Sequence, residues 1–334
     1  MRLGVACAVA LLTSLTSFSA AAQAPFKLRA SVDTSATHGR TISVADYLKK
    51  LQEASGGRIE TELFHSGQLF RDRDVAKALR QGSVEMAVPG TWVLTGFVPD
   101  TDVFSLPIFY GQPLEAVHRI TDGPIGQTIN KEIEGKLGVK VLGPWLDLGH
   151  QNVYTTSKPL NDFGDLAGLK LRNSGGAGQF ARTKFFNAQP NMTAWPDVPL
   201  ALSQGTFDGV YSTNESLASA KLWESGIRYG FEDHDFMGEY IPLISEAFWK
   251  KLPPDLQKLM IDVWRDNIDT YRKNMDEAQK EARRTLEKNG VKFVDLTDAQ
   301  LAEVRKKMLP LQDGIAGELR ITPSLVTQIM SVLQ

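Results

Sequence analysis

The sequence predicts an α/β protein built from two successive sets of mostly parallel strands. Short apolar strands alternate with amphipathic helices along the chain, a pattern that places helices against the faces of a parallel sheet. A second set of such elements follows the apolar segment 138–143. The length of 334 residues exceeds the roughly 100–200 residues of one domain, so the chain is long enough for two lobes.

The first elements follow one another in strand–helix–strand order. The helical segments carry apolar residues at intervals of three and four, whereas the segment 58–64 alternates apolar and polar side chains. We therefore expect a strand over 26–32, a helix over 41–54, a strand over 58–64, a helix over 72–81 and a strand over 84–88.

The composition changes after Pro253 and Pro254. The segment 255–288 is highly charged, with apolar residues at helical spacing, and this predicts one long helix. No low-complexity linker separates the two sets of strands. We therefore expect strands that cross between the lobes and a helix that braces both, rather than a flexible tether.

The amino-terminal segment predicts export. Arg2 precedes an apolar run over 3–12, and three alanines at 20–22 supply a small-residue cleavage site before Gln23. The run is shorter than the about 20 apolar residues that span a bilayer. We expect residues 1–22 to be a cleaved signal peptide and the protein to reside in the periplasm.

Cysteine usage and net charge exclude several classes of function. The one cysteine, Cys7, lies in the predicted signal peptide, so the remaining chain of about 312 residues (334 minus 22) has no disulfide and no thiol chemistry. The formal net charge is −2, which favours neither nucleic acid nor an anionic membrane as a partner. We expect a monomer.

Arg172 is the most informative single residue. It ends the apolar strand segment 168–173 and precedes a loop of small residues over 174–178. A guanidinium is permanently charged and can donate two parallel hydrogen bonds, so it matches a carboxylate ligand. The alternative is a structural ion pair with Asp197 or Asp208.

Motifs for metal binding and catalysis are weak. The segment 232–235 contains ligand-type side chains, but consecutive residues cannot all converge on one ion, and we interpret it as a solvated turn. The glycines at 175–178 lack the lysine and hydroxyl of a phosphate-binding loop. No G-x-S-x-G nucleophile motif occurs. We expect no metal, no cofactor and no catalytic residue.

Several short motifs together resemble one family. Their order and spacing are similar to those of the solute-binding proteins of tripartite ATP-independent periplasmic (TRAP) transporters, of the dicarboxylate-binding (DctP) type. The resemblance covers nearly all of the chain after residue 22. The segments that carry it are 66–69, 79–88, 104–109, 158–172 and 201–209.

The resemblance implies a two-lobed periplasmic-binding-protein fold, with a mixed sheet and flanking helices in each lobe. The lobes would close on a small acid, which is then delivered to a membrane permease without ATP hydrolysis. We expect the first lobe to comprise 23–147 and 236–275, and the second lobe, with the C-terminal helices, to comprise 148–235 and 276–334.

The resemblance also assigns site residues. Arg172 becomes the partner of the ligand carboxylate. Two positions depart from the family pattern: His150 stands where many members have a second arginine, and Tyr211 where many have a glutamate. Histidine is only partly charged near neutral pH. Tyr211 replaces a fixed anion with an aromatic ring and a hydroxyl, so we expect a pocket less polar than one built for a polyhydroxylated acid or a dicarboxylate. His150 could equally be a structural residue.

Further residues could complete the pocket. Trp195 stands where the family has an aromatic ring against the ligand, although it could pack in a core, and Trp92 is a candidate wall of the first lobe. His38 follows the first strand and would either contact ligand or cap the next helix. An oxygen beside the carboxylate could be bonded by His150, Asn152, Asn173 or Tyr211.

The sequence thus predicts a solute-binding protein for a small organic monocarboxylate, a 2-hydroxy or 2-oxo acid with an apolar or aromatic remainder. The alternative of another class is a secreted lyase or hydrolase on a similar scaffold that uses His150 and Asp208. A sensor subunit of a membrane receptor would share the same pocket.

Overall fold

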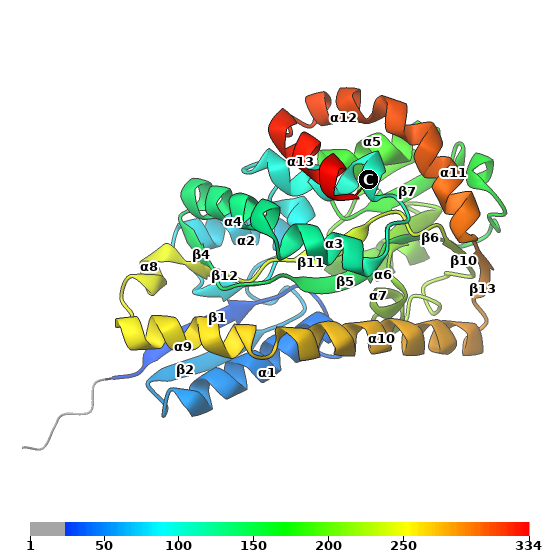
Figure 1. Ribbon diagram of the computed structural model, residues 1–334. Coiled ribbons are helices and arrows are strands. Elements are labelled where there is room, and N and C mark those ends of the chain that lie inside the picture. The colour runs from blue at the N-terminus through cyan, green and yellow to red at the C-terminus, as the bar shows by residue number, and fades with distance from the viewer. Residues whose placement is uncertain (1–23, 334) are drawn as a thin grey trace, which may run out of the picture.

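The computed structural model describes residues 24–333 (Figure 1). The predicted signal peptide at 1–22 lies outside the described residues. The described chain forms two α/β lobes, each around its own sheet, and a two-stranded ribbon between them. Within 24–333, none of the helices is both long and apolar enough to span a bilayer.

The first lobe is built around a five-stranded sheet. Its strands are β1 (Phe26–Ser31), β2 (Ile59–Phe64), β3 (Met86–Ala87), β4 (Val139–Val141) and β12 (Leu243–Ser245), in the order β2-β1-β3-β12-β4. β1 is parallel to β2 and β3, and β12 is antiparallel to β3 and β4. The helices of this part of the chain are α1 (Gly39–Ala54), α2 (Asp72–Arg80), α3 (Leu114–Thr121), α4 (Pro124–Leu137) and α8 (Glu246–Trp249), with 3-10 turns η1 (Thr91–Val93), η2 (Pro99–Ser105) and η3 (Pro107–Phe109).

The second lobe is built around a six-stranded mixed sheet. Its strands are β6 (Asn152–Thr155), β7 (Lys170–Asn173), β8 (Gln189–Met192), β9 (Gly209–Ser212), β10 (Tyr229–Glu232) and β13 (Lys292–Asp295), in the order β13-β10-β6-β9-β7-β8. β7 is parallel to β8 and β9, and β6 is antiparallel to β9 and β10. Its helices are α5 (Ala177–Phe185), α6 (Val198–Ser203) and α7 (Asn214–Ser219), with η4 (Phe163–Leu166) and η5 (Trp195–Asp197).

A ribbon of two antiparallel strands joins the lobes. β5 (Leu146–His150) leads from the first sheet to the second, and β11 (Met237–Tyr240) returns. Their register shifts between Gly238 and Glu239. Crossing strands of this kind match the connection expected from the sequence, since no flexible tether intervenes.

The predicted long helix is divided into two. α9 (Pro254–Arg265) buries Leu256, Met260 and Trp264 in the core of the first lobe, and α10 (Ile268–Lys288) buries Leu286 in the second. Figure 1 shows the two helices running along one side of both sheets. The break falls at Asn267, whose side chain donates to the carbonyl of Val263 at 2.8 Å. The two helices together therefore still brace both lobes, as expected of the single helix.

The C-terminal helices lie differently from the prediction. They are α11 (Asp298–Met308), α12 (Gln312–Glu318) and α13 (Pro323–Leu333), with η6 (Leu309–Leu311). Ala316, Leu325 and Ile329 belong to the same hydrophobic cluster as the first sheet, because the apolar face of α13 covers α3 and α4. The sequence interpretation assigns 276–334 to the second lobe, but α12 and α13 contribute to the core of the first, while Leu301 and Met308 of α11 form a separate cluster with Tyr110.

Candidate functional site

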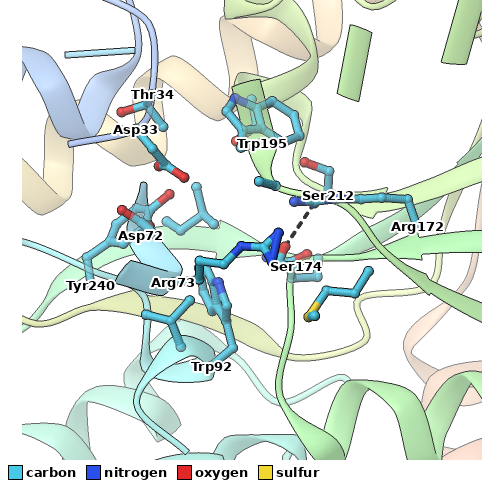
Figure 2. A pocket seen from close by; sticks show the side chains of 16 residues that line it. Asp33, Thr34, Asp72, Arg73, Trp92, Arg172, Ser174, Trp195, Ser212 and Tyr240 are labelled. Carbon is cyan, nitrogen blue, oxygen red and sulfur yellow. Dashed lines mark hydrogen bonds between the residues drawn. The ribbon is translucent and has the colours of Figure 1, made fainter. Parts of the chain in front are cut away.

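A cavity of about 50 Å³ lies between the lobes. One water needs about 10–15 Å³ in this measure, so this cavity has room for only a small ligand. Figure 2 shows the side chains that line it. They come from both lobes and from the ribbon and include Asp33, Thr34, Asp72, Arg73, Trp92, Arg172, Ser174, Trp195, Ser212 and Tyr240.

The cavity lies at strand ends. Asp33 follows β1, Arg172 lies near the end of β7, and Ser212 ends the adjacent strand β9. The carboxyl ends of parallel strands meet at one edge of a sheet, where loops diverge and ligands bind. The two sheets therefore present these edges to the same cavity.

Arg172 is held by neutral groups. Its Nε donates to the carbonyl of Thr193 at 2.9 Å, and its Nη1 donates to Ser174 Oγ at 2.9 Å (Figure 2). The ring centroid of Trp195 lies 5.3 Å from the guanidinium carbon of Arg172, a cation–π distance. These contacts fix the orientation of the guanidinium without neutralising its charge.

No carboxylate within residues 24–333 forms an ion pair with Arg172. The two candidates from the sequence are otherwise engaged: Asp197 pairs with Arg71, and Asp208 accepts from the backbone N–H of Lys170 at 2.8 Å. Arg172 is only 2% exposed, and burial lowers its pKa to about 10 although Asp33 and Tyr240 oppose this. Arg172 therefore remains charged at neutral pH, and none of the described residues forms an ion pair with it.

The opposite wall of the cavity is acidic. Arg40, which is fully buried, forms ion pairs with both Asp33 and Asp72, the latter at 2.8 Å. Burial raises the pKa of Asp72 to about 7, with a further rise from Asp33 and against the effect of Arg40. Figure 2 shows Asp33 and Asp72 on one side and Arg172 on the other. The cavity thus has a cationic end and an end that accepts hydrogen bonds.

Aromatic rings form two further walls. Trp92 packs against Tyr240 with ring centroids 5.6 Å apart, and Trp195 covers Arg172. Of the residues predicted from the sequence, Arg172, Trp195 and Trp92 share this cavity.

His38 does not line the cavity but lies between the lobes. Its Nδ1 accepts from the backbone N–H of Arg40 at 3.0 Å, so it caps α1. Its Nε2 lies 2.9 Å from Glu215 and 3.0 Å from Ser216 Oγ, both in α7 of the second lobe. The capping alternative is therefore observed, and the same ring connects the lobes.

Other contacts also hold the lobes together. Arg71 of the first lobe pairs with Asp197 of the second, and the backbone N–H of Gly178 in α5 donates to Asp102 Oδ2 at 2.9 Å. Because these bonds span the two lobes, the conformation is a closed one.

Tyr211 and Asn173 point away from the cavity. Tyr211 packs with Val153, Leu171 and Phe231, and its buried hydroxyl makes no hydrogen bond to residues 24–333. Side chains alternate across a strand, and its neighbour Ser212 is the residue that lines the cavity. Asn173 donates to Thr183 Oγ1 at 3.0 Å inside the second lobe.

His150 and Asn152 line a different cavity. It has a volume of about 550 Å³ and lies beside α10 and the ribbon. The ring of His150 stacks on that of His234 with centroids 4.7 Å apart. Burial, with a smaller effect of His234, lowers the pKa of His150 to about 3, so it is neutral at neutral pH.

The segment 232–235 is not a solvated turn. Asp233 and Asp235 are buried and form ion pairs with Arg182 of α5, whose guanidinium carbon lies 3.8 Å from the ring centroid of Tyr110. The prediction was wrong because Arg182, which is 51 residues before Asp233 in the sequence, pairs with both aspartates inside the protein.

The cavity-lining residues that the sequence interpretation missed include Asp33, Asp72, Arg73 and Tyr240. The position of Asp33 directly after the first strand was a usable signal. Asp72 begins a helix and Tyr240 ends a ribbon strand, and neither position indicates a cavity without the fold.

Residues 31–318 match the family described as bacterial extracellular solute-binding protein, family 7. The chain is 25% identical over 277 residues to the C4-dicarboxylate-binding periplasmic protein DctP of Rhodobacter capsulatus, covering 81% of each chain. It is 25% identical over 283 residues to the 2,3-diketo-L-gulonate-binding periplasmic protein YiaO of Escherichia coli, covering 85% of each.

Solved structures share the fold. The sugar acid binding protein DctPAm of Advenella mimigardefordensis, in complex with galactonate, matches with a TM-score of 0.87 at 19% identity, over 93% of this chain and 98% of that one. A TRAP periplasmic solute-binding protein of Sulfurospirillum deleyianum with bound succinate matches with a TM-score of 0.84 at 23% identity, over 93% and 100%.

Proposed function

The chain belongs to the bacterial extracellular solute-binding protein family 7, and from this premise we propose that it captures a small organic monocarboxylate for a TRAP transporter. Solute-binding proteins of TRAP transporters are periplasmic, bind small organic acids and work with membrane permease components. The proposed ligand is a 2-hydroxy or 2-oxo acid with an apolar or aromatic remainder.

The observation that carries the proposal is the unpaired cation in the cavity. A buried charge without a partner is costly, and Arg172 bonds two neutral groups but forms no ion pair with a carboxylate of residues 24–333. A ligand carboxylate would supply the negative charge that Arg172 lacks, and its two oxygens would match the planar donors of the guanidinium.

The opposite wall supports a monocarboxylate. Asp33 and Asp72 can accept a hydrogen bond from a ligand hydroxyl, and the one negative charge that Arg40 leaves unbalanced on the ionised pair would disfavour a second carboxylate. Trp92, Trp195 and Met192 also line the cavity, which favours an apolar remainder.

The test is a thermal-shift panel on the mature protein. Hydroxy monocarboxylates are compared with their primary amides, with dicarboxylates and with neutral sugars of similar size. A ligand at 100 times its Kd adds about 2.7 kcal/mol of stability, so the hydroxy acids should raise the melting temperature and the amides should not. If amides or sugars stabilised the protein as well as acids, the proposal would be wrong.

The enzyme alternative has little geometric support. His150 lines the second cavity and Asp208 is bonded to Lys170, so they do not meet in the cavity between the lobes. Ligand recovered chemically unchanged after denaturation supports capture, whereas turnover on prolonged incubation would support an enzyme. We also propose export to the periplasm, for which mass spectrometry of the exported protein should find Gln23 as its first residue.

A further inference from the structure

A compact set of metal-ligand side chains lies outside the ligand cavity. His118 of α3, Asp147 of β5 and Glu239 of β11 each place one donor atom within 4.8 Å of the other two. Asp147 is only 2% exposed and Glu239 is fully buried. The three residues come from three elements, and the ribbon supplies two of them.

Three of their four carboxylate oxygens have no hydrogen-bond partner among the described residues. Asp147 Oδ1 lies 2.8 Å from His118 Nε2, but Asp147 Oδ2 and both oxygens of Glu239 make no hydrogen bond to residues 24–333. Buried carboxylates are normally paired, hydrogen-bonded or bound to metal. A single imidazole does not satisfy two such groups.

Arg272 does not fill this role. Its terminal nitrogens donate to Asp122 at 2.7 and 2.9 Å and its Nε donates to the carbonyl of Trp145 at 2.9 Å, while its Nε remains 3.6 Å from Asp147 Oδ1. When ionised, Asp122, Asp147 and Glu239 carry three negative charges against the one positive charge of Arg272. A divalent cation would balance the remaining two.

We propose that His118, Asp147 and Glu239 bind a divalent transition metal, with zinc as the best match. One imidazole and two carboxylates form a three-ligand set that suits Zn²⁺ and leaves a fourth position for water. Access is open, because Asp147 also lines the cavity of about 550 Å³ and the His118 side chain is 23% exposed. The ion would tie α3 to the ribbon that joins the lobes.

The test is zinc titration of untagged mature protein after treatment with EDTA. We expect one zinc per chain by elemental analysis and a melting temperature that rises with zinc and falls again with EDTA. Glu239→Gln should lose more than about tenfold in zinc affinity, and His118→Ala should do the same. His65→Ala is the matched control, because His65 bonds only Ser66 among the described residues, and it should bind zinc like the wild type.

The melting temperature of Glu239→Gln in EDTA shows whether a loss of zinc binding results from misfolding. The amide has the shape of the acid without its charge, so in EDTA this variant should melt at or above the wild-type temperature. The proposal is overturned if EDTA-treated wild type takes up no stoichiometric zinc, which would assign the site to a proton shared by Asp147 and Glu239. It is also overturned if Glu239→Gln and His118→Ala bind zinc as the wild type does, which would indicate adventitious surface binding. Manganese as a second probe separates a zinc site from one that prefers oxygen-rich ligand sets.

Discussion

Two buried arginines of the second lobe, Arg172 and Arg182, have opposite surroundings. Arg172 has hydrogen bonds to neutral groups and no carboxylate among the described residues, and burial lowers its pKa to about 10. Burial alone would also lower the pKa of Arg182, but Asp235, Tyr110 and Asp233 raise it above the ordinary value. Arg172 thus lacks an anionic partner among the described residues, whereas Arg182 has two.

The difference separates a binding residue from a structural one. A buried ion pair contributes little net stability, yet removal of one partner is strongly destabilising because it leaves a buried charge. Removal of an unpaired buried cation has no such cost. The two arginines should therefore respond to substitution in opposite ways, in stability and in ligand affinity.

The largest effect is expected for Arg182→Leu. This change leaves Asp233 and Asp235 buried without a cation, so the free energy of unfolding should fall by about 3–5 kcal/mol. Equilibrium unfolding in guanidinium chloride measures it. A variant that also carries Asp233→Asn and Asp235→Asn should recover most of the loss. An unchanged free energy of unfolding in Arg182→Leu would contradict the structural role of Arg182 and its contrast with Arg172.

Asp33→Asn tests the wall of the cavity that faces Arg172. A hydrogen bond to a charged group is worth about 1.5–3 kcal/mol, so the preference for a hydroxy monocarboxylate over a dicarboxylate should fall by about 10- to 150-fold. Calorimetric titration of both ligands gives the ratio. Asp208→Asn, which lies outside the cavity, serves as the control. A preserved preference in Asp33→Asn would mean that the acidic wall does not select the ligand.

The buried aspartates that pair with Arg182 should also make the free energy of unfolding depend on pH. Burial raises the pKa of Asp235 to about 8, and Asp233 adds to this against Arg182. The folded state then binds more protons than the unfolded state between about pH 4 and pH 8, so stability falls as pH rises, by up to about 1.4 kcal/mol per pH unit. Asp235→Asn should remove this slope when unfolding is compared from pH 5 to pH 8. Parallel curves for the two proteins would contradict the assignment.

The smallest effect is expected for His150→Gln. Its ring lines the second cavity and stays neutral at neutral pH, so ligand affinity should change by less than about twofold. The pH profile of affinity from pH 5.5 to pH 8 should also match that of the wild type. A loss of ligand affinity greater than tenfold would mean that His150 contacts the ligand, which is the role that the sequence analysis considered.

Much of the fold could be predicted from local patterns. The strand expected over 26–32 is Phe26–Ser31, and the helix expected over 41–54 is Gly39–Ala54, because hydrophobic periodicity is a local property of the chain. The packing of α13 on the first lobe could not be predicted, since an apolar helix face does not indicate which surface it covers.

The site was predictable only in part. Arg172 could be found because a strand end and a small-residue loop are both visible in sequence. Tyr211 was misplaced by one residue, since a shift of one position moves a strand side chain to the other face. The environment of 232–235 depends on Arg182, which is distant in sequence and supplied by another element. Partners of this kind are set by tertiary structure.

The most direct test of the central claim is calorimetric titration of wild type, Arg172→Lys and Arg172→Ala with the acid identified by the thermal-shift panel, together with melting curves without ligand. Arg172→Ala should lose about 2–5 kcal/mol of binding free energy, which is about 30- to 4,000-fold in affinity. Lysine should restore only part of this, because it lacks the planar pair of donors. Without ligand, the melting temperature should be unchanged or slightly raised in Arg172→Ala. Near-equal affinities in the three proteins, or a large drop in the ligand-free melting temperature, would contradict the claim that Arg172 is kept unpaired for a ligand carboxylate.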